Sequence, residues 1–252
     1  MKQAIIVFLA MGIFTRLFST SDSEPQKVQI QKHETEMPSS EALARRDRSI
    51  VFLKAKKVPT MDQLPVIEDS LTSRIRSPKE IAERLVACTI CAVGGETGDR
   101  ALVSQLLRDF GAEGFLSPAE RAFLDQGIGV QQERVQYSWR YERSWVLLWA
   151  LGYIDRLDYP PSICDVPKIA GLLRGKTIAQ ILQEAKPRSQ KELLDQADLI
   201  YRLHWAVVDE RVNQRVRVPA EVEKGVVQER HAALNWLIGY MGQEWDDIST
   251  DT

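Results

Sequence analysis

Apolar residues recur at helical spacing through almost the whole chain beyond residue 40, and this periodicity limits the fold more than any other feature. No window of four to eight residues alternates strictly enough to predict a strand. Residues 144–151 are nearly all apolar and include Trp145 and Trp149, and a helix that is apolar all round belongs at the centre of a bundle. We therefore predict an all-α fold, a single domain of about eight helices around an apolar, Trp-rich central helix.

Short start signals divide this helical sequence into segments. Ser77-Pro78 and Ser117-Pro118 each place a serine at the N-cap and a proline at the first helical position, and Glu120 gives Ser117 the spacing of a capping box. Ser40 can cap the first helix. The expected helices cover residues 41–57, 78–94, 99–110, a segment from 118, 131–152, 166–173, 177–185, 190–217 and 220–241.

The first 40 residues differ from the rest of the chain. An apolar run from Ala4 to Phe14 is too short to cross a bilayer as a helix but has the length of a signal-peptide core. We interpret residues 1–21 as a signal-like or anchor segment, in which residues 4–18 could tether the chain to a membrane. The polar residues 22–40 are typical of a disordered tether, and residues 41–252 form the helical domain. We therefore expect an exported or membrane-tethered protein of the bacterial envelope, with a cytoplasmic protein as the alternative.

Charge and cysteine content narrow the classes of partner. The chain has 33 Lys and Arg against 35 Asp and Glu, so no basic excess is present to neutralise phosphates, and we expect no nucleic-acid partner. Three cysteines are too few for a disulfide framework. Cys88 and Cys91 match the CxxC spacing of redox sites, but they lie inside an apolar helix, which favours buried structural cysteines. We expect no cofactor.

Three polar residues are placed on apolar helix faces. His204 lies in the middle of an apolar stripe of its helix, Arg230 lies among apolar neighbours, and Glu142 faces the core side of the central helix. Because a buried charge is costly unless paired, we predict a buried Glu142–Arg230 pair with His204 nearby. Such a cluster could be a catalytic site that moves a proton and binds an anion, but we favour a structural network that fixes helix register.

We interpret two further polar residues, Arg202 and His231, as surface residues of their helices. Arg202 shares the polar side of its helix with Asp195, Asp198 and Asp209, and Asp198 precedes it by one helical turn. This pattern favours a solvated helix face. His231 is at the border of its helix's polar face, and we interpret it as an amphipathic edge residue.

The C-terminal carboxylates Asp246, Asp247 and Asp251 could hold a divalent cation. The pattern of a calcium-binding loop is absent from the sequence. We therefore favour a solvated chain end anchored by Trp245, and we expect no metal.

Several short strings are distinctive when taken together. They are Leu64-Pro65-Val66-Ile67, Phe115-Leu116-Ser117-Pro118-Ala119-Glu120-Arg121, Trp139-Arg140-Tyr141-Glu142-Arg143, Leu148-Trp149-Ala150-Leu151-Gly152, Cys164-Asp165, Ala197-Asp198-Leu199-Ile200-Tyr201-Arg202-Leu203-His204-Trp205-Ala206, Glu229-Arg230-His231-Ala232-Ala233-Leu234-Asn235-Trp236 and Trp245-Asp246-Asp247. In combination they resemble the bacterial domain-of-unknown-function family 4272, from roughly Ala42 to the C-terminus. This family carries no established activity, so the resemblance implies a domain and its boundaries but no mechanism.

We weigh three functions for such a domain. The first is a non-catalytic binding or interaction module with an unknown protein or small-molecule partner, favoured because no known catalytic motif is visible in the sequence. The second is an enzyme of unknown class that uses Glu142, His204 and Arg230. The third is an immunity-type partner of a secreted toxin, for which a large acidic or apolar exposed patch is expected.

Overall fold

The computed structural model describes residues 37–157, 159–219 and 221–252, and Pro38–Thr252 forms one compact unit. Over these ranges the secondary structure is helical and includes no β-strand, which confirms the predicted all-α fold. The described residues form ten α-helices rather than about eight. Residues 1–21 and most of 22–40, which we interpret as leader and tether, lie outside the described residues. No helix in the described ranges is long and apolar enough to cross a membrane.

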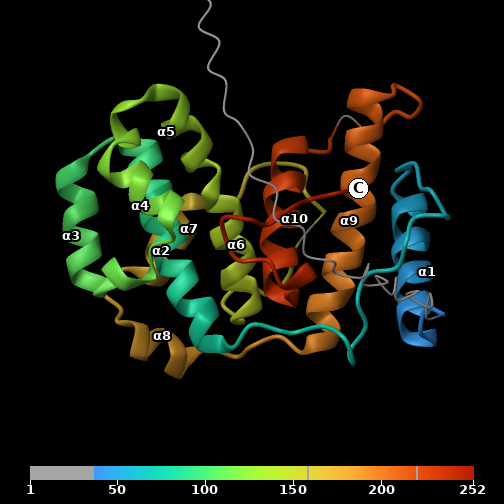
Figure 1. Cartoon of the computed structure of the whole chain (residues 1–252), viewed down its shortest axis with the longest axis horizontal. Coiled ribbons are helices and arrows are strands. Elements are labelled where there is room, and N and C mark those ends of the chain that lie inside the picture. Colours follow the sequence, from blue (N-terminus) through green and yellow to red (C-terminus); the bar gives the residue numbers. More distant parts are fainter. Residues whose placement is uncertain (1–36, 158, 220) are drawn as a thin grey trace, which may run out of the picture. The chain divides into compact units, whose positions relative to one another are not determined.

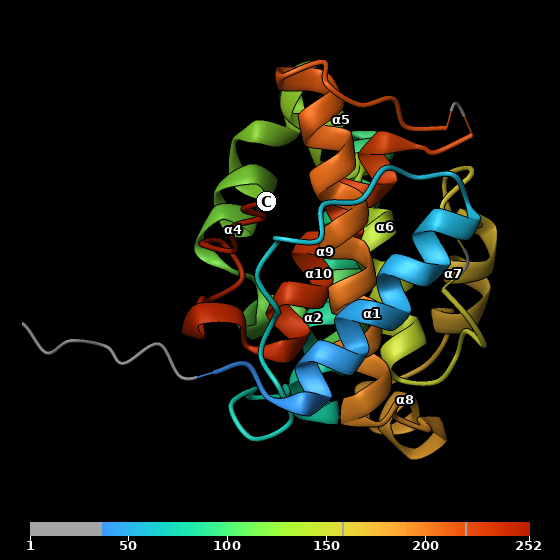
Figure 2. The same cartoon turned by 90° about the vertical axis from the view of Figure 1, so that its right-hand side faces the viewer.

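Five helices follow one another in a row, and each packs on the next. Their order in space is α2 (Pro78–Thr97), α6 (Arg140–Ala150), α10 (Lys224–Ile238), α9 (Gln190–Val212) and α1 (Ser40–Ala55). Figure 1 shows the row from α2, left of the middle of the view, to α1 at its right-hand side, and Figure 2 shows α1 lying across α9. Helix α9 is therefore covered on two sides, by α10 and by α1.

Shorter elements surround this row. Helix α2 is contacted by α3 (Arg100–Phe110), η1 (Ala112–Phe115), α4 (Pro118–Asp125), α5 (Gln131–Ser138) and α8 (Ile178–Glu184), and α6 is contacted by α7 (Val166–Leu173). The 3-10 turns η2 (Gly127–Gly129) and η3 (Tyr240–Gly242) follow α4 and α10.

Helix α6 is the apolar centre that the sequence predicts. Leu147 and Leu148 are fully buried, and α6 lies between α2 and α10. The predicted helix over 131–152 is nevertheless two helices, because α5 ends at Ser138 and α6 begins at Arg140. The break lets the backbone of α5 approach α2 at Gly95, where a Cβ atom would lie only 2.5 Å from the Ser138 nitrogen.

The helix-start signals are confirmed at the serine–proline sites. Ser77 and Ser117 both form complete capping boxes. The first helix is capped by Ser39 rather than Ser40, since the Ser39 hydroxyl accepts the backbone N–H of Ala42 at 3.2 Å. The long helix α9 stops at Val212, five residues earlier than predicted.

Candidate functional site

Glu142 and Arg230 form the buried pair that their helical placement predicts. The Arg230 Nε atom lies 3.5 Å from Glu142 Oε2, and the two side chains are 7% and 2% exposed. Helix α10 supplies the guanidinium and α6 the carboxylate. The other carboxylate oxygen of Glu142 accepts the backbone N–H of Cys164, so Glu142 also fixes the segment that precedes α7. This pair therefore joins three separate parts of the chain.

His204 makes its contact with His231 rather than with Glu142. The two Nδ1 atoms are 2.8 Å apart, so the N–H of one ring donates a hydrogen bond to the ring nitrogen of the other, and the ring planes are nearly perpendicular. Burial lowers the pKa of His204 to about 4, with a smaller contribution from the charge of Arg211. Burial, followed by the charge of His204, lowers the pKa of His231 to about 3. Both rings are therefore neutral at pH 7, and the expected three-residue cluster is divided into two pairs.

The prediction that His231 is an edge residue is wrong, because its side chain is almost completely buried. The prediction of a solvated face around Arg202 is wrong for the same reason. Arg202 and Asp198 are both buried, and two hydrogen bonds of 2.9 Å join them. A third bond of 3.1 Å runs from Arg202 to the carbonyl oxygen of Pro65. The polar side of α9 is covered by other parts of the chain, so its ion pair holds the segment around Pro65 instead of facing water.

The start of α4 is a polar cluster that sequence reasoning did not find. Glu120 closes the capping box by accepting the Ser117 N–H, and it also accepts bonds from Arg84 and from the indole nitrogen of Trp245. Asp246 accepts the Ser117 hydroxyl at 2.6 Å and the backbone N–H of Ala119 at 2.9 Å. The capping-box spacing was visible in the sequence, but nothing local to it indicated its partners in the C-terminal segment.

These contacts give Asp246 a role in capping a helix. Of the other two carboxylates that we considered for a cation, Asp247 and Asp251 are both exposed. Within residues 37–157, 159–219 and 221–252, no group of three or more His, Cys, Asp or Glu side chains is arranged to hold a metal ion.

The two cysteines of the CxxC string are buried free thiols inside α2, as predicted. Burial raises the pKa of Cys88 to about 12, and it also raises the pKa of Cys91 well above its usual value. Because the thiolate is the reactive form, neither cysteine is suited to nucleophilic or redox chemistry at neutral pH.

Arg230 also reaches a pocket of about 610 Å³ that lies among α1, the segment after α6, α9 and α10. We call it the arginine pocket, because five arginines line it: Arg45, Arg48, Arg156, Arg188 and Arg230. Three carboxylates line it as well, those of Asp155, Glu192 and Asp195. The described lining residues therefore carry two more positive charges than negative ones.

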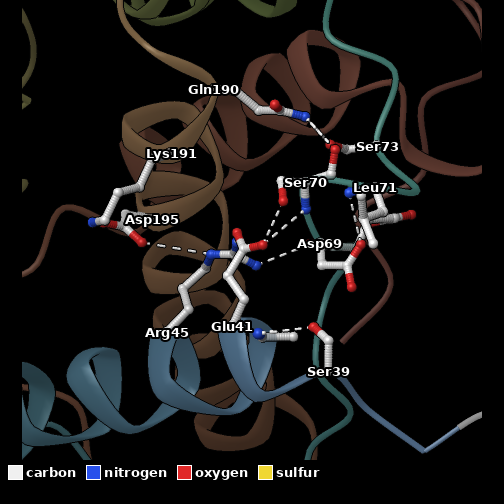
Figure 3. A network of polar contacts seen from close by, with 12 residues as sticks. Ser39, Glu41, Arg45, Asp69, Ser70, Leu71, Ser73, Gln190, Lys191 and Asp195 are labelled. Atoms are coloured by element: carbon white, nitrogen blue, oxygen red, sulfur yellow. Dashed lines mark hydrogen bonds and ion pairs between the residues drawn. The ribbon is translucent and has the colours of Figure 1, made fainter.

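Asp195 shows how incompletely these positive charges are neutralised. Its carboxylate lies 3.5 Å from Arg45, 2.6 Å from Arg48 and 2.6 Å from Lys191, and Glu41 is a second carboxylate partner of Arg45, so these three positive charges share two negative ones. Burial opposes ionisation of Asp195, but hydrogen bonds from Lys191 and Arg48 outweigh it and hold the pKa of that carboxyl below its usual value. Figure 3 shows Arg45 and Lys191 on either side of Asp195.

A network of polar contacts holds Arg45 in place beside Asp195 (Figure 3). Arg45 is 1% exposed, pairs with Glu41 one turn earlier, and donates to the carbonyl oxygen of Glu68. Glu41 in turn accepts bonds from the backbone and the hydroxyl of Ser70. The network ties α1 to the segment around Ser70 and to the start of α9, so the pocket wall is held from several directions.

Much of the remaining wall of the arginine pocket is apolar or aromatic. Its walls include Phe52, Trp149, Leu199 and Leu203. The hydroxyl of Tyr159, another lining residue, is buried and has no hydrogen-bond partner among the residues that the structure describes. Burial, followed by the charge of Glu221, raises the pKa of Tyr159 to about 12, so this group remains a hydrogen-bond donor at neutral pH. This hydroxyl can therefore donate a hydrogen bond to a water or to a ligand oxygen in the pocket.

Comparison with known proteins gives one match. The family model described as "Domain of unknown function (DUF4272)" matches residues 45–248, which is most of the chain. Neither the curated proteins nor the solved structures include a match to this sequence.

Proposed function

The chain belongs to the DUF4272 family, for which no function is established, and from its site we propose a non-catalytic binding module that takes a small molecule with an anionic group. The observation that carries the proposal is the arginine pocket, in which the single carboxylate of Asp195 is shared by Arg45, Arg48 and Lys191. A pocket of about 610 Å³ is within the usual range for small-molecule sites.

The geometry of the pocket suggests the form of the ligand. Arg48 has a side chain that is 52% exposed, so its guanidinium can turn toward an incoming carboxylate or phosphate. Phe52, Trp149 and Leu203 offer apolar surface to the rest of the molecule. The Tyr159 hydroxyl can donate to one more oxygen. A compact aromatic body with one anionic group fits these features, because Phe52 and Trp149 offer ring surfaces beside the guanidinium groups.

The second function, an enzyme built on Glu142, His204 and Arg230, receives less support. Glu142 is engaged by Arg230 and by the backbone of Cys164, and His204 is engaged by a second neutral histidine. These contacts connect several of the sequence motifs on which the family resemblance rests. Such contacts are what a structural network requires, and a reacting group would instead need access to substrate.

Calorimetric titration of the full chain with phenyl phosphate tests the proposal, with benzyl alcohol as the neutral probe. We expect saturable binding of phenyl phosphate that weakens as salt is added, and much weaker binding of benzyl alcohol. Arg48→Glu should raise the dissociation constant at least about tenfold. Arg46→Glu is the matched control, because it makes the same charge change on the same helix and Arg46 does not line the pocket.

Three outcomes would contradict the proposal: no saturable binding of phenyl phosphate, equal binding of benzyl alcohol, or equal losses in the two variants. The immunity-type function, for which we expect a large acidic or apolar exposed patch, stays a separate proposal. Capture of partners from the native host, with fractionation of the same cells, tests that function. It also tests our further proposal of export or membrane tethering, which rests on the apolar run from Ala4 to Phe14.

A further inference from the structure

A second pocket lies toward the α2 end of the helix row, among α2, α3, the start of α6 and the turn that joins α7 to α8. Its volume is also about 610 Å³. Six of its lining residues are apolar side chains on α2 and α3, namely Val86, Ile90, Val93, Leu102, Leu106 and Phe110. Figure 1 shows α3 beside α2, with α7 and α8 nearby. None of these six residues lines the arginine pocket.

The apolar stripe of α3 is incompletely covered on this side. Leu102, Leu106 and Phe110 are four residues apart, so they lie on one face of the helix. Val103 and Leu107 of the same helix are buried, whereas these three side chains are only half-buried. The pocket is therefore bordered by apolar surface that remains partly in contact with water, and covering that surface would be favourable.

The polar groups in the wall already have partners inside the protein. The Tyr141 hydroxyl donates to Glu96 at 2.6 Å, and the Thr89 hydroxyl donates to the carbonyl oxygen of Leu85 at 2.7 Å. Thr177 accepts the backbone N–H of Gln180 in the capping box of α8. Since these groups need no further hydrogen bonds, the interior of the pocket suits a ligand body without polar atoms.

Positive charge is found at one border of the pocket. Arg174 and Lys176 line it from the turn between α7 and α8, on either side of Gly175, whose φ of +71° allows the tight turn. Lys176 is paired with Glu184. Arg174 is exposed and forms no ion pair with any residue in the described ranges. One carboxylate, that of Asp109, is among the described lining residues, so the cations exceed the anions by one.

We propose that this pocket binds a single-chain amphiphile with a carboxylate head, such as the anion of a fatty acid. The alkyl chain lies along Leu102, Leu106 and Phe110 and covers their exposed surface. The carboxylate lies at Arg174, because a guanidinium can hold both oxygens of a carboxylate at once. This site is separate from the arginine pocket, so the proposal does not depend on the function proposed above.

Titration of the full chain with dodecanoate, kept below the concentration at which it forms micelles, tests the site. We expect one saturable site per chain and a dissociation constant at least about tenfold lower than for dodecyltrimethylammonium, which has the same chain and the opposite charge. Arg174→Glu should weaken dodecanoate binding at least about tenfold. Leu106→Trp should abolish binding, because the larger side chain occupies the space of the alkyl chain.

Controls separate this site from the arginine pocket and from general loss of structure. Arg108→Glu makes the same charge change at an exposed position of α3 that does not line the pocket, and it should leave binding unchanged. Arg48→Glu should also leave dodecanoate binding unchanged, although it should weaken phenyl phosphate. Circular dichroism checks the fold of each variant. If Leu106→Trp fails to fold, Arg174→Glu still tests the site, because Arg174 is exposed and its replacement should not disturb the core.

The proposal is overturned if no chain length from octanoate to hexadecanoate binds saturably. It is also overturned if dodecyltrimethylammonium binds as tightly as dodecanoate, or if Arg174→Glu has no more effect than Arg108→Glu. If folded Leu106→Trp still binds dodecanoate, the amphiphile lies elsewhere, and the proposal is overturned as well.

Discussion

Arg230 keeps its guanidinium in the interior because the carboxylate of Glu142 lies beside it. Replacing Arg230 with alanine would leave that carboxylate buried without its cation. We therefore expect Arg230→Ala to lower the free energy of unfolding by about 3–5 kcal/mol, measured by urea denaturation. The exposed Lys79→Ala should change it by no more than about 0.5 kcal/mol.

A double variant distinguishes lost charge pairing from lost packing. Glu142→Gln with Arg230→Met removes both charges and retains most of the volume and the oxygen that accepts the Cys164 N–H. We expect it to be more stable than Arg230→Ala, because no buried charge remains unpaired. If Arg230→Ala unfolds at the same urea concentration as the unmodified chain, the buried pair has no energetic importance.

The pair of His204 and His231 should make the folded state sensitive to mild acid. Both have pKa values in the folded state, about 4 and about 3, that lie below the ordinary value near 6.5. As the pH falls below about 6.5, the unfolded chain binds protons that the folded chain does not. Stability is therefore complete above pH 6.5 and declines toward pH 4.5, by up to about 1.4 kcal/mol per pH unit for each histidine.

Urea denaturation between pH 7.5 and 4.5 measures this decline. The variant His204→Leu/His231→Leu should lose most of the slope over that interval, because most carboxylates titrate at lower pH. Should this variant not fold, the ring signals of the two histidines in NMR spectra of the unmodified chain give the same information. A midpoint near pH 6.5 for both rings would contradict the prediction.

At the scale of helices, the contact between α2 and α5 depends on a missing side chain. A Cβ on Gly95 would lie 2.5 Å from the Ser138 nitrogen and 2.6 Å from the Arg134 oxygen, both of them backbone atoms. We expect Gly95→Ala to destabilise the protein by about 1–3 kcal/mol despite the better helix propensity of alanine. Thermal unfolding followed by circular dichroism measures the change.

The neighbouring Gly94 supplies a matched comparison in the same helix. Its added Cβ would meet side-chain atoms of Leu124 and Val103 at 3.2 and 3.3 Å, and these can shift by a few tenths of an ångström. Gly94→Ala should therefore be much closer to neutral than Gly95→Ala. Equal effects of the two substitutions would mean that α5 does not lie against Gly95.

The start of α4 should be energetically coupled to the C-terminal segment. Ser117→Ala removes a helix cap and the hydroxyl that donates to Asp246, and we expect a loss of about 1–2 kcal/mol. A double-mutant cycle with Asp246→Ala should give a coupling energy above about 0.5 kcal/mol. The same cycle with Ser189→Ala, which removes the cap of α9, should be additive. Additivity in both cycles would contradict the contact.

Helix starts could be predicted from the sequence because their signals are local. Ser77 and Ser117 place a hydroxyl, a proline and a glutamate within four residues, and the structure forms both capping boxes. The break at Trp139 could not be predicted, because no side-chain cap marks the start of α6 and the contact that the break allows joins α5 to Gly95, which is far away in sequence. Local sequence signals thus predict where a helix begins. They do not predict a helix end that depends on contacts with distant residues.

Helical periodicity located the Glu142–Arg230 pair but misjudged Arg202 and His231. The pattern within one helix shows which face is more apolar, and it does not show how many neighbours cover that helix. Helix α9 is packed on both α10 and α1, so its polar side is buried as well. In the candidate site, Arg230 could be found from its own helix, whereas the arginine pocket is assembled from four distant segments and has no sequence signature.

At the scale of the whole molecule, α1 is the helix at the end of the row, and its main helical neighbour is α9. Arg45 holds it there through Glu41, Asp195 and the backbone of Glu68. We expect the backbone amides of α1 to exchange with solvent faster than those of α6, because α1 has fewer buried neighbours. Arg45→Met should increase exchange in α1 selectively, as hydrogen-exchange mass spectrometry would show. Uniform exchange across α1 and α6 would contradict this.

Trp245 and Asp246 form hydrogen bonds with the start of α4, and these bonds can form only late in synthesis of the chain. Trp245 follows its partner Glu120 by 125 residues, so at about 5–20 residues per second a ribosome adds it about 6–25 seconds later. Throughout that interval Glu120 lacks one of its donors, and the Ser117 hydroxyl lacks its acceptor. During this period the start of α4 lacks its C-terminal partners, so chaperones and proteases can reach it in the nascent chain. A premature stop codon only a few positions before Trp245 would make that unfinished state permanent.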